Sequence, residues 1–214
     1  MGPRPPAEYK KYHLDRNDER LELFVGLARE FGLGRVLYPG SYVHFTPSFV
    51  FPDVVYVDTM KAAAEVFADP RTLAYIKFRK RYAQEPNLTF HYADYRRPLP
   101  EAPESFDFLL SLWAGFVAKH CGKYLRAGGV MLANNSHGNA GWAALDPSFE
   151  LVAVVRRRSG EFSFSTEQLE SYFEPKRPGE RITKECLERL GRGVAYTKSA
   201  TAYAFRKRKP GAGQ

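Results

Sequence analysis

The spacing of apolar residues along the chain alternates between helical periods and short continuous runs. Helical periods predict amphipathic helices, and short apolar runs bounded by turn residues predict strands. In the first two thirds of the chain the two kinds of segment alternate. Helices are expected at 15–34, 60–69, 73–86 and 112–126, and strands at 35–38, 54–57, 88–94, 106–112 and 128–135. Asp15, Asn17 or Asp18 can cap the first helix and Gly32 can end it.

The pattern changes after Asn135, where strands and hairpins dominate. A strand and hairpin are expected at 149–166, a short helix at 166–173, and a final strand or hairpin at 193–208. Strands that alternate with helices favour a parallel sheet. We therefore expect a Rossmann-like, three-layer α/β sandwich with a mostly parallel seven-stranded sheet whose last strand is reversed.

No internal repeat or flexible linker divides the chain, so a single domain is expected over 15–209. Residues 1–14 are expected to form an arm without fixed structure, or a lid that closes over a ligand through Tyr9 and Tyr12. Residues 210–214 form a tail, and 174–193 an insertion or an elaboration of the sheet edge.

Composition narrows the class of protein. The 214 residues are 44% hydrophobic, yet there is no apolar run of about 18 residues that would span a bilayer. The first residues are charged and proline-rich rather than apolar, and Cys121 and Cys186 form no C-x-x-C pair. A cytoplasmic, reduced protein without a membrane role is expected.

The net charge of +8 raises the question of nucleic acid. The basic residues fall in separate runs, at 77–81, 156–158 and 206–209. Such runs are typical of solvated faces beside apolar strands, although nucleic-acid binding stays open.

Candidate chemistry lies at the carboxyl ends of the predicted strands, where open parallel sheets bind ligands. Gly40, after the first strand, lets the backbone approach a ligand closely. Asp58, after the second, can accept hydrogen bonds from both ribose hydroxyls, and Asp94, after the third, from an adenine amine. Each residue also has a local interpretation, because Gly40 can serve a turn, Asp58 can cap the next helix, and Asp94 can shape a turn. Their order at three successive strands indicates a site for a nucleoside-type cofactor.

The chain resembles the class I S-adenosylmethionine-dependent methyltransferases over about 15–135 and in its last strand. "VLYPG" is similar to the glycine-rich first motif of that family, "VVYVD" to the strand that ends in the ribose-binding acid, and "HYADY" to the segment with the adenine-contacting acid. "FDFLLSLWAGF" and "YLRAGGVML" match the fourth- and fifth-strand motifs. The resemblance implies S-adenosylmethionine as cofactor, bound by residues from four strand ends: Tyr38, Pro39, Gly40, Ser41, Asp58, Thr59, Asp94, Tyr95, Ser111, Leu112 and Trp113.

The first motif departs from the family pattern. The family has an acid at the strand end and at least two glycines, whereas this chain has Tyr38 and Gly40. Residues 41–53 are too few for the usual first helix and include two prolines, so one helical turn near 47–50 is expected there. The sequence therefore predicts a remodelled cofactor loop.

The segment 133–146, "ANNSHGNAGWAALD", follows the fifth strand and is rich in hydrogen-bonding side chains. His137 is a candidate general base and Asn134 or Asn135 a candidate for orienting the acceptor. The alternative is a polar turn that satisfies its own backbone. The other histidines lack metal-ligand spacing, so no metal is expected.

These observations predict a methyltransferase that positions an acceptor for direct transfer, with a small molecule favoured and the oligomeric state left open. Two rivals remain. One is a catalytically inactive protein of this fold that binds nucleic acid or a protein through its basic faces. The other is a nicotinamide-dependent reductase, disfavoured because no G-x-G-x-x-G follows the first strand.

Overall fold

The computed structural model describes residues 2–177, 179 and 181–209. Its contacts divide the chain into two compact units, Met1–Leu99 and Pro100–Gln214, called here the N-terminal and C-terminal units. Each unit is described by itself. The expected single domain over 15–209 stays a prediction.

Three parallel strands form the sheet of the N-terminal unit. They are β1 (Val36–Pro39), β2 (Asp53–Asp58) and β3 (Asn87–Tyr92). β2 lies between the other two, with Val36 opposite Val54 and Val54 opposite Leu88. The apolar run at 54–57 is fully buried, as expected of a strand covered on both faces.

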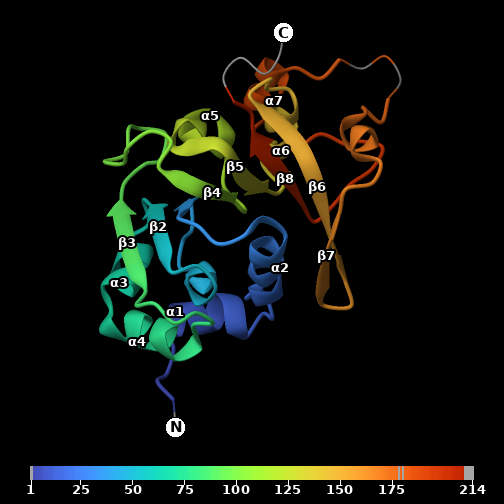
Figure 1. The fold of residues 1–214 in the computed structure, drawn as a ribbon. Helices are drawn as coiled ribbons and strands as arrows, with labels where there is room; N and C mark the ends of the chain where they lie inside the picture. Colours follow the sequence, from blue (N-terminus) through green and yellow to red (C-terminus); the bar gives the residue numbers. More distant parts are fainter. Residues whose placement is uncertain (1, 178, 180, 210–214) are drawn as a thin grey trace. The chain divides into compact units, whose positions relative to one another are not determined.

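Helices and one short turn accompany these strands (Figure 1): α2 (Leu21–Phe31), η2 (Thr46–Phe49), α3 (Lys61–Ala68) and α4 (Pro70–Arg79). η2 is the single helical turn that the sequence predicts in the first-motif loop. α2 ends at Gly32 as expected but begins only at Leu21, and Arg20 in a left-handed conformation takes the cap position instead of an aspartate or asparagine. α4 stops at Arg79, before the predicted end at 86, because the chain turns and the Arg81 amide donates to the Phe49 carbonyl.

The first residues are ordered, so the expectation of an arm without fixed structure is wrong. They form α1 (Ala7–Tyr9) and the π-helical segment η1 (Lys10–Leu14). Tyr9 is completely buried and its ring stacks on Phe45 with centroids 3.9 Å apart. A helix this short is marginal by itself, and burial of the Tyr9 ring contributes to holding it in place.

The C-terminal unit contains five strands. They are β4 (Phe106–Ser111), β5 (Leu125–Ala133), β6 (Phe149–Arg158), β7 (Glu161–Ser165) and β8 (Ala202–Lys207). β4 and β5 are parallel, whereas β8 lies antiparallel between β5 and β6. β7 pairs with β6 as a hairpin at the sheet edge, coloured orange in Figure 1.

Short helical segments complete this unit: α5 (Val117–Cys121), η3 (Gly122–Tyr124), α6 (Asn139–Ala144), η4 (Leu169–Phe173) and α7 (Lys184–Leu190). The helix expected over 112–126 is thus much shorter. Trp113 adopts a left-handed φ of 69°, which breaks the helical path, and the side chain of Asn139 accepts a hydrogen bond from the Ala118 amide in the first turn of α5.

The predicted fold class is confirmed: the chain is a Rossmann-like α/β protein with parallel strands and a reversed last strand, β8. The described residues form eight strands rather than seven, because the β6–β7 hairpin adds an edge strand.

Candidate functional site

A small cavity lies at the carboxyl ends of β2 and β3 in the N-terminal unit. Its volume is about 170 Å³. Five of the predicted cofactor residues line it together with Ala93 and Arg96: Gly40, Asp58, Thr59, Asp94 and Tyr95. Residues from three separate predicted segments therefore meet at one place, as the order of the strands requires.

Gly40 shapes one wall of this cavity. It has a φ of 65°, a left-handed conformation that glycine adopts without a steric cost. Its amide donates to the Val57 carbonyl at 2.7 Å, which ties the loop after β1 to the end of β2. The loop backbone is thereby held against the strand that carries Asp58.

Asp58 connects the loop to the start of α3. Its carboxylate accepts hydrogen bonds from the amides of Tyr42 at 2.7 Å and Met60 at 2.8 Å, and the residue is 8% exposed. Met60 is the N-cap residue of α3, so Asp58 fixes the turn that leads into this helix rather than capping its first turn. A carboxylate has about four lone-pair positions, so two acceptor positions remain for hydroxyl groups.

Asp94 forms a tight turn with Arg96. Its carboxylate accepts from the Arg96 amide at 2.9 Å and from the guanidinium at 2.7 Å. These bonds, the guanidinium first, lower the pKa of Asp94 to about 2, so the carboxylate is ionised at neutral pH. The predicted turn role of Asp94 is confirmed, and Arg96 is a cavity residue that the strand-end reasoning missed. The Asp-x-Arg spacing at a turn could have indicated it.

Three other residues of the first motif lie beside the cavity without lining it: Tyr38, Pro39 and Ser41. Tyr38 is buried, and its hydroxyl is 3.1 Å from Nδ1 of His44. Burial raises the pKa of Tyr38 and lowers that of His44 well below its usual value. The polar pair supports the loop from within, and a direct cofactor contact of these three residues stays a prediction.

A larger cavity of about 540 Å³ lies in the C-terminal unit. One side comes from the ends of β4 and β5, with Trp113, Asn134, Asn135 and Ser136. The other side is the segment before β8, from Val194 to Tyr203. Because β8 runs antiparallel to β5, with Tyr203 opposite Ala133, its beginning lies at the edge where β5 ends. The sequence analysis did not include Tyr196, Lys198 and Tyr203 among the candidate site residues. The predicted reversal of the last strand could have indicated them, because it places the start of that strand beside the end of the fifth.

Amide groups organise this cavity. Oδ1 of Asn134 accepts from the Ser136 hydroxyl at 2.9 Å, and Oδ1 of Asn135 accepts from the Gly141 amide at 3.1 Å. The predicted interpretation of this segment as a turn that satisfies its own backbone is therefore partly confirmed. Both bonds use the amide oxygens, and the amide nitrogens of these side chains are hydrogen-bond donors.

The predicted residues after β4 differ in exposure. Ser111 and Leu112 are buried, and the Ser111 hydroxyl accepts from the side chain of Asn139 at 2.9 Å. Trp113 is 60% exposed and presents its ring at the cavity.

His137 is exposed and is not among the residues lining the cavity. Its role as a general base stays a prediction that the geometry does not favour. Cys121 is buried, which raises the pKa of its thiol to about 12, and neither cysteine forms a disulfide. Cys121 is thus a core residue rather than a nucleophile.

The described part of the chain lacks two further kinds of feature. No cluster of three or more histidine, cysteine, aspartate or glutamate residues there could hold a metal ion. No helix there combines the length and hydrophobicity that crossing a bilayer requires.

Solved structures share this fold. The N-methyltransferase NodS from Bradyrhizobium japonicum WM9, in complex with S-adenosyl-L-homocysteine, aligns over 95% of this chain and 92% of its own, with 12% identity and a TM-score of 0.51. A methyltransferase from Thermotoga maritima, described as a possible histamine N-methyltransferase, aligns over 94% and 95%, with 14% identity and a TM-score of 0.50. The chain therefore has the fold of the class I S-adenosylmethionine-dependent methyltransferases.

Comparisons of sequence add nothing to this likeness of fold. No family model matches the chain, and no curated protein matches it either. A third solved structure, from Methanococcus maripaludis, aligns over 59% of each chain with a TM-score of 0.44, which is too partial to bear on the fold.

Proposed function

We propose that this protein is an S-adenosylmethionine-dependent methyltransferase that acts on a small-molecule acceptor. The observation that carries the proposal is the cavity at Gly40, Asp58 and Asp94, which combines a closely approaching backbone with two carboxylates. The shared fold supports it, because ligands of open α/β sheets bind at this edge.

The residues of the N-terminal unit suit the nucleoside part of the cofactor. Asp58 has two unused acceptor positions and would hold the ribose hydroxyls. Asp94, Tyr95 and Thr59 would line the adenine side of the same cavity. In the C-terminal unit, Ser111 and Leu112 would support Trp113, whose exposed ring offers a stacking surface.

The cavity of the C-terminal unit suits an acceptor. Trp113 and Tyr196 provide aromatic faces, and Asn134 and Asn135 provide side-chain amides that can orient a hydroxyl or amine. The cofactor supplies an activated methyl group with a neutral thioether as leaving group. The chain has to orient the acceptor and exclude water during transfer, so Asn135 is the proposed orienting residue. The methylated acceptor then loses its proton to solvent, so His137 is not required as a base.

Titration calorimetry with S-adenosylmethionine, S-adenosyl-L-homocysteine and NAD tests the proposal on the full chain. We expect the first two to bind and NAD not to bind. Loss of a hydrogen-bonded carboxylate contact costs about 1.5–3 kcal/mol, so Asp58→Ala should weaken binding at least about tenfold.

Asp53→Ala is the matched control, because Asp53 begins the same strand that Asp58 ends. Asp53 lies 3.4 Å from Arg35 and is not among the cavity residues. A folded Asp58→Ala variant with unchanged affinity would refute the ribose assignment. If the wild-type protein binds neither sulfur compound but binds a defined RNA below micromolar concentration at physiological salt, the inactive, nucleic-acid-binding alternative replaces the proposal.

A further inference from the structure

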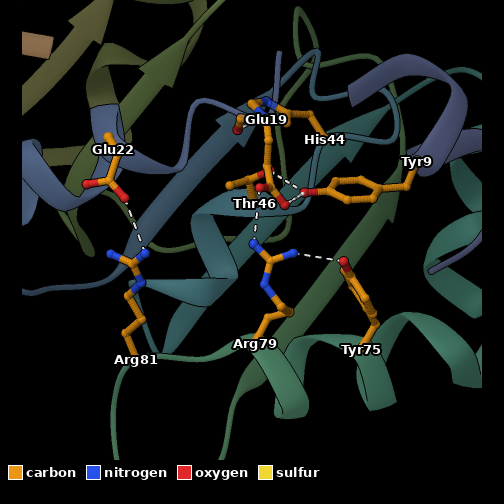
Figure 2. Close-up of polar contacts among 8 residues, drawn as sticks. All are labelled: Tyr9, Glu19, Glu22, His44, Thr46, Tyr75, Arg79 and Arg81. Atoms are coloured by element: carbon orange, nitrogen blue, oxygen red, sulfur yellow. Dashed lines mark hydrogen bonds and ion pairs between the residues drawn. The ribbon is translucent and has the colours of Figure 1, made fainter. Parts of the chain in front are cut away.

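The N-terminal segment is anchored to its unit through Tyr9. Figure 2 shows the Tyr9 hydroxyl between Glu19 and Thr46, at 2.8 and 2.6 Å. Glu19 also accepts from Arg79 at 3.1 Å, and Arg79 donates to the Tyr75 hydroxyl at 2.8 Å. Burial is the main cause that raises the pKa of Tyr9, so its hydroxyl keeps its proton and donates to the Glu19 carboxylate. The segment around Tyr9 is therefore held in one position.

This anchor brings two neighbouring side chains to the cofactor loop. The carboxylate of Glu8 accepts from the Tyr42 hydroxyl at 3.5 Å. The rings of Tyr12 and Tyr42 meet edge to face, with centroids 5.2 Å apart. Burial, followed by the proximity of Tyr12 and Glu8, raises the pKa of Tyr42 to about 12, so Tyr42 stays neutral. The carboxylate of Glu8 and the rings of Tyr12 and Tyr42 are thus grouped beside the loop that follows β1.

Tyr42 connects this group to the predicted cofactor cavity. Its backbone amide donates to Asp58, the proposed ribose ligand. Its φ of 48° lies in the left-handed region, which a tyrosine rarely adopts. Such strain persists where the surroundings fix it, and it is concentrated at binding sites. A ligand whose ribose sits on Asp58 and which extends along the loop beyond Gly40 would meet Tyr42 and Glu8.

The grouped side chains have the chemistry of a cation site. A carboxylate binds an ammonium group through charge-assisted hydrogen bonds, and aromatic rings attract cations to their faces. The group already attracts two cations of the chain, since Arg16 and Lys11 lie 4.8 and 5.0 Å from the centre of the Tyr12 ring. These two basic groups could in turn pair with a carboxylate next to the bound ammonium.

We propose that Glu8 binds the α-ammonium group of the amino-acid part of the cofactor, with Tyr12 and Tyr42 beside it. The first strand ends without an acid, and the N-terminal segment supplies the carboxylate in its place. This inference rests on the proposed function. It makes the predicted lid a part of the cofactor site, with Tyr9 as its fixed anchor.

The test compares two ligands of the full chain by titration calorimetry. S-Adenosyl-L-homocysteine carries the amino-acid part, whereas 5′-methylthioadenosine keeps only the adenine, the ribose and the sulfur. We expect Glu8→Gln to weaken the binding of S-adenosyl-L-homocysteine at least about tenfold, which is the effect of one charge-assisted hydrogen bond. The affinity for 5′-methylthioadenosine should change by less than about twofold. Asp15→Asn is the matched control, because Asp15 follows the same segment but pairs with Lys10 at 2.6 Å.

The outcomes separate this inference from the proposed function. If the wild-type protein binds neither ligand, the proposed function fails and Glu8 has no cofactor to bind. If it binds both and Glu8→Gln leaves the two affinities unchanged, or weakens both equally, the role of Glu8 is refuted while the cofactor site stands. If the Glu8→Gln variant does not fold, a change in the ligand tests the same contact in the wild-type protein. An analogue of S-adenosyl-L-homocysteine that lacks the amine should bind at least about tenfold more weakly than S-adenosyl-L-homocysteine itself. Equal binding of the two compounds would overturn the inference.

Discussion

The cavity beside Asp58 and the cavity beside Trp113 differ in size and in the groups that line them. The cavity of the N-terminal unit is about 170 Å³ and has two carboxylates, each fixed by backbone amides. The cavity of the C-terminal unit is about 540 Å³ and is lined by aromatic rings, amides and hydroxyls, with Lys198 as the charged residue among its described lining residues. Fixed carboxylates select one pattern of donors, whereas a wide, mainly neutral cavity accepts varied shapes. The contrast suits a constant cofactor in one unit and a variable acceptor in the other.

The largest expected effect is the loss of the anchor in the N-terminal unit. Tyr9→Ala removes a fully buried ring and its hydrogen bonds, and should lower the free energy of unfolding by about 3–5 kcal/mol. Urea unfolding followed by circular dichroism measures the loss, and Tyr12→Ala, at a partly exposed neighbour, is the control. Fluorescence of Trp113 and Trp142, both in the C-terminal unit, shows whether the loss spreads to that unit. A loss below about 1 kcal/mol would contradict the anchor.

A second change affects the C-terminal unit. An added Cβ at Gly193 would lie 2.1 Å from the Asn135 carbonyl oxygen, closer than any contact allows. Gly193→Ala must therefore displace the wall of Val194 and Ala195, at a cost of about 1–3 kcal/mol. We expect a lower melting temperature and unchanged affinity for S-adenosyl-L-homocysteine, with Ala195→Ser as the control on the same wall. A tenfold loss of cofactor affinity would show that the two cavities are not separable in this way.

The third prediction concerns the buried imidazoles of the N-terminal unit. Burial lowers the pKa of His44 and of His13, whose rings stack with centroids 4.3 Å apart. Nδ1 of His44 faces the Tyr38 hydroxyl, its Nε2 faces the Glu19 carbonyl, and Arg20 adds a nearby positive charge. The unfolded chain binds more protons below its own histidine pKa of about 6.5, so stability should fall as the pH drops through 6.5.

The loss should be at most about 1.4 kcal/mol per pH unit for each histidine. Melting temperatures between pH 7.5 and 5 measure it. His44→Gln should flatten the dependence in this range, whereas His137→Gln, at an exposed position, should leave it as in the wild-type protein. An equal slope in all three proteins would assign the effect to other groups.

The smallest effect is expected in the basic runs. Arg79 belongs to one of them but its side chain is only 26% exposed, and it stacks on Phe49 and pairs with Glu19. Arg158, at the exposed end of β6, belongs to another. Arg158→Ala should change the free energy of unfolding by less than about 0.5 kcal/mol, measured by urea unfolding, whereas Arg79→Ala should cost clearly more. Equal losses of stability in the two variants would mean that the contacts of Arg79 with Phe49 and Glu19 add nothing beyond the effect of an exposed charge.

The strand ends were the most predictable part of this protein. The observed bounds of β2 and β4 lie within one residue of those predicted from their apolar runs, because a short continuous apolar run is typical of a strand in the core. Gly40, Asp58 and Asp94 then follow from the rule that parallel strands end at one edge, and they do line one cavity. The sequence also predicted the turn at Asp94, since this turn depends on a neighbour within two residues.

Contacts between distant segments were decided only by the tertiary structure. Tyr9 looked like part of an unstructured arm, and its burial depends on Phe45, Thr46 and Glu19, which no local pattern connects with it. The helix expected after β4 is shortened by a left-handed Trp113 and an Asn139 cap from another helix. Local periodicity thus determined which segments become strands and where their polar ends lie. Packing over long sequence distances decided which side chains reach those ends, because burial and hydrogen bonding outweigh the weak conformational preferences of short segments.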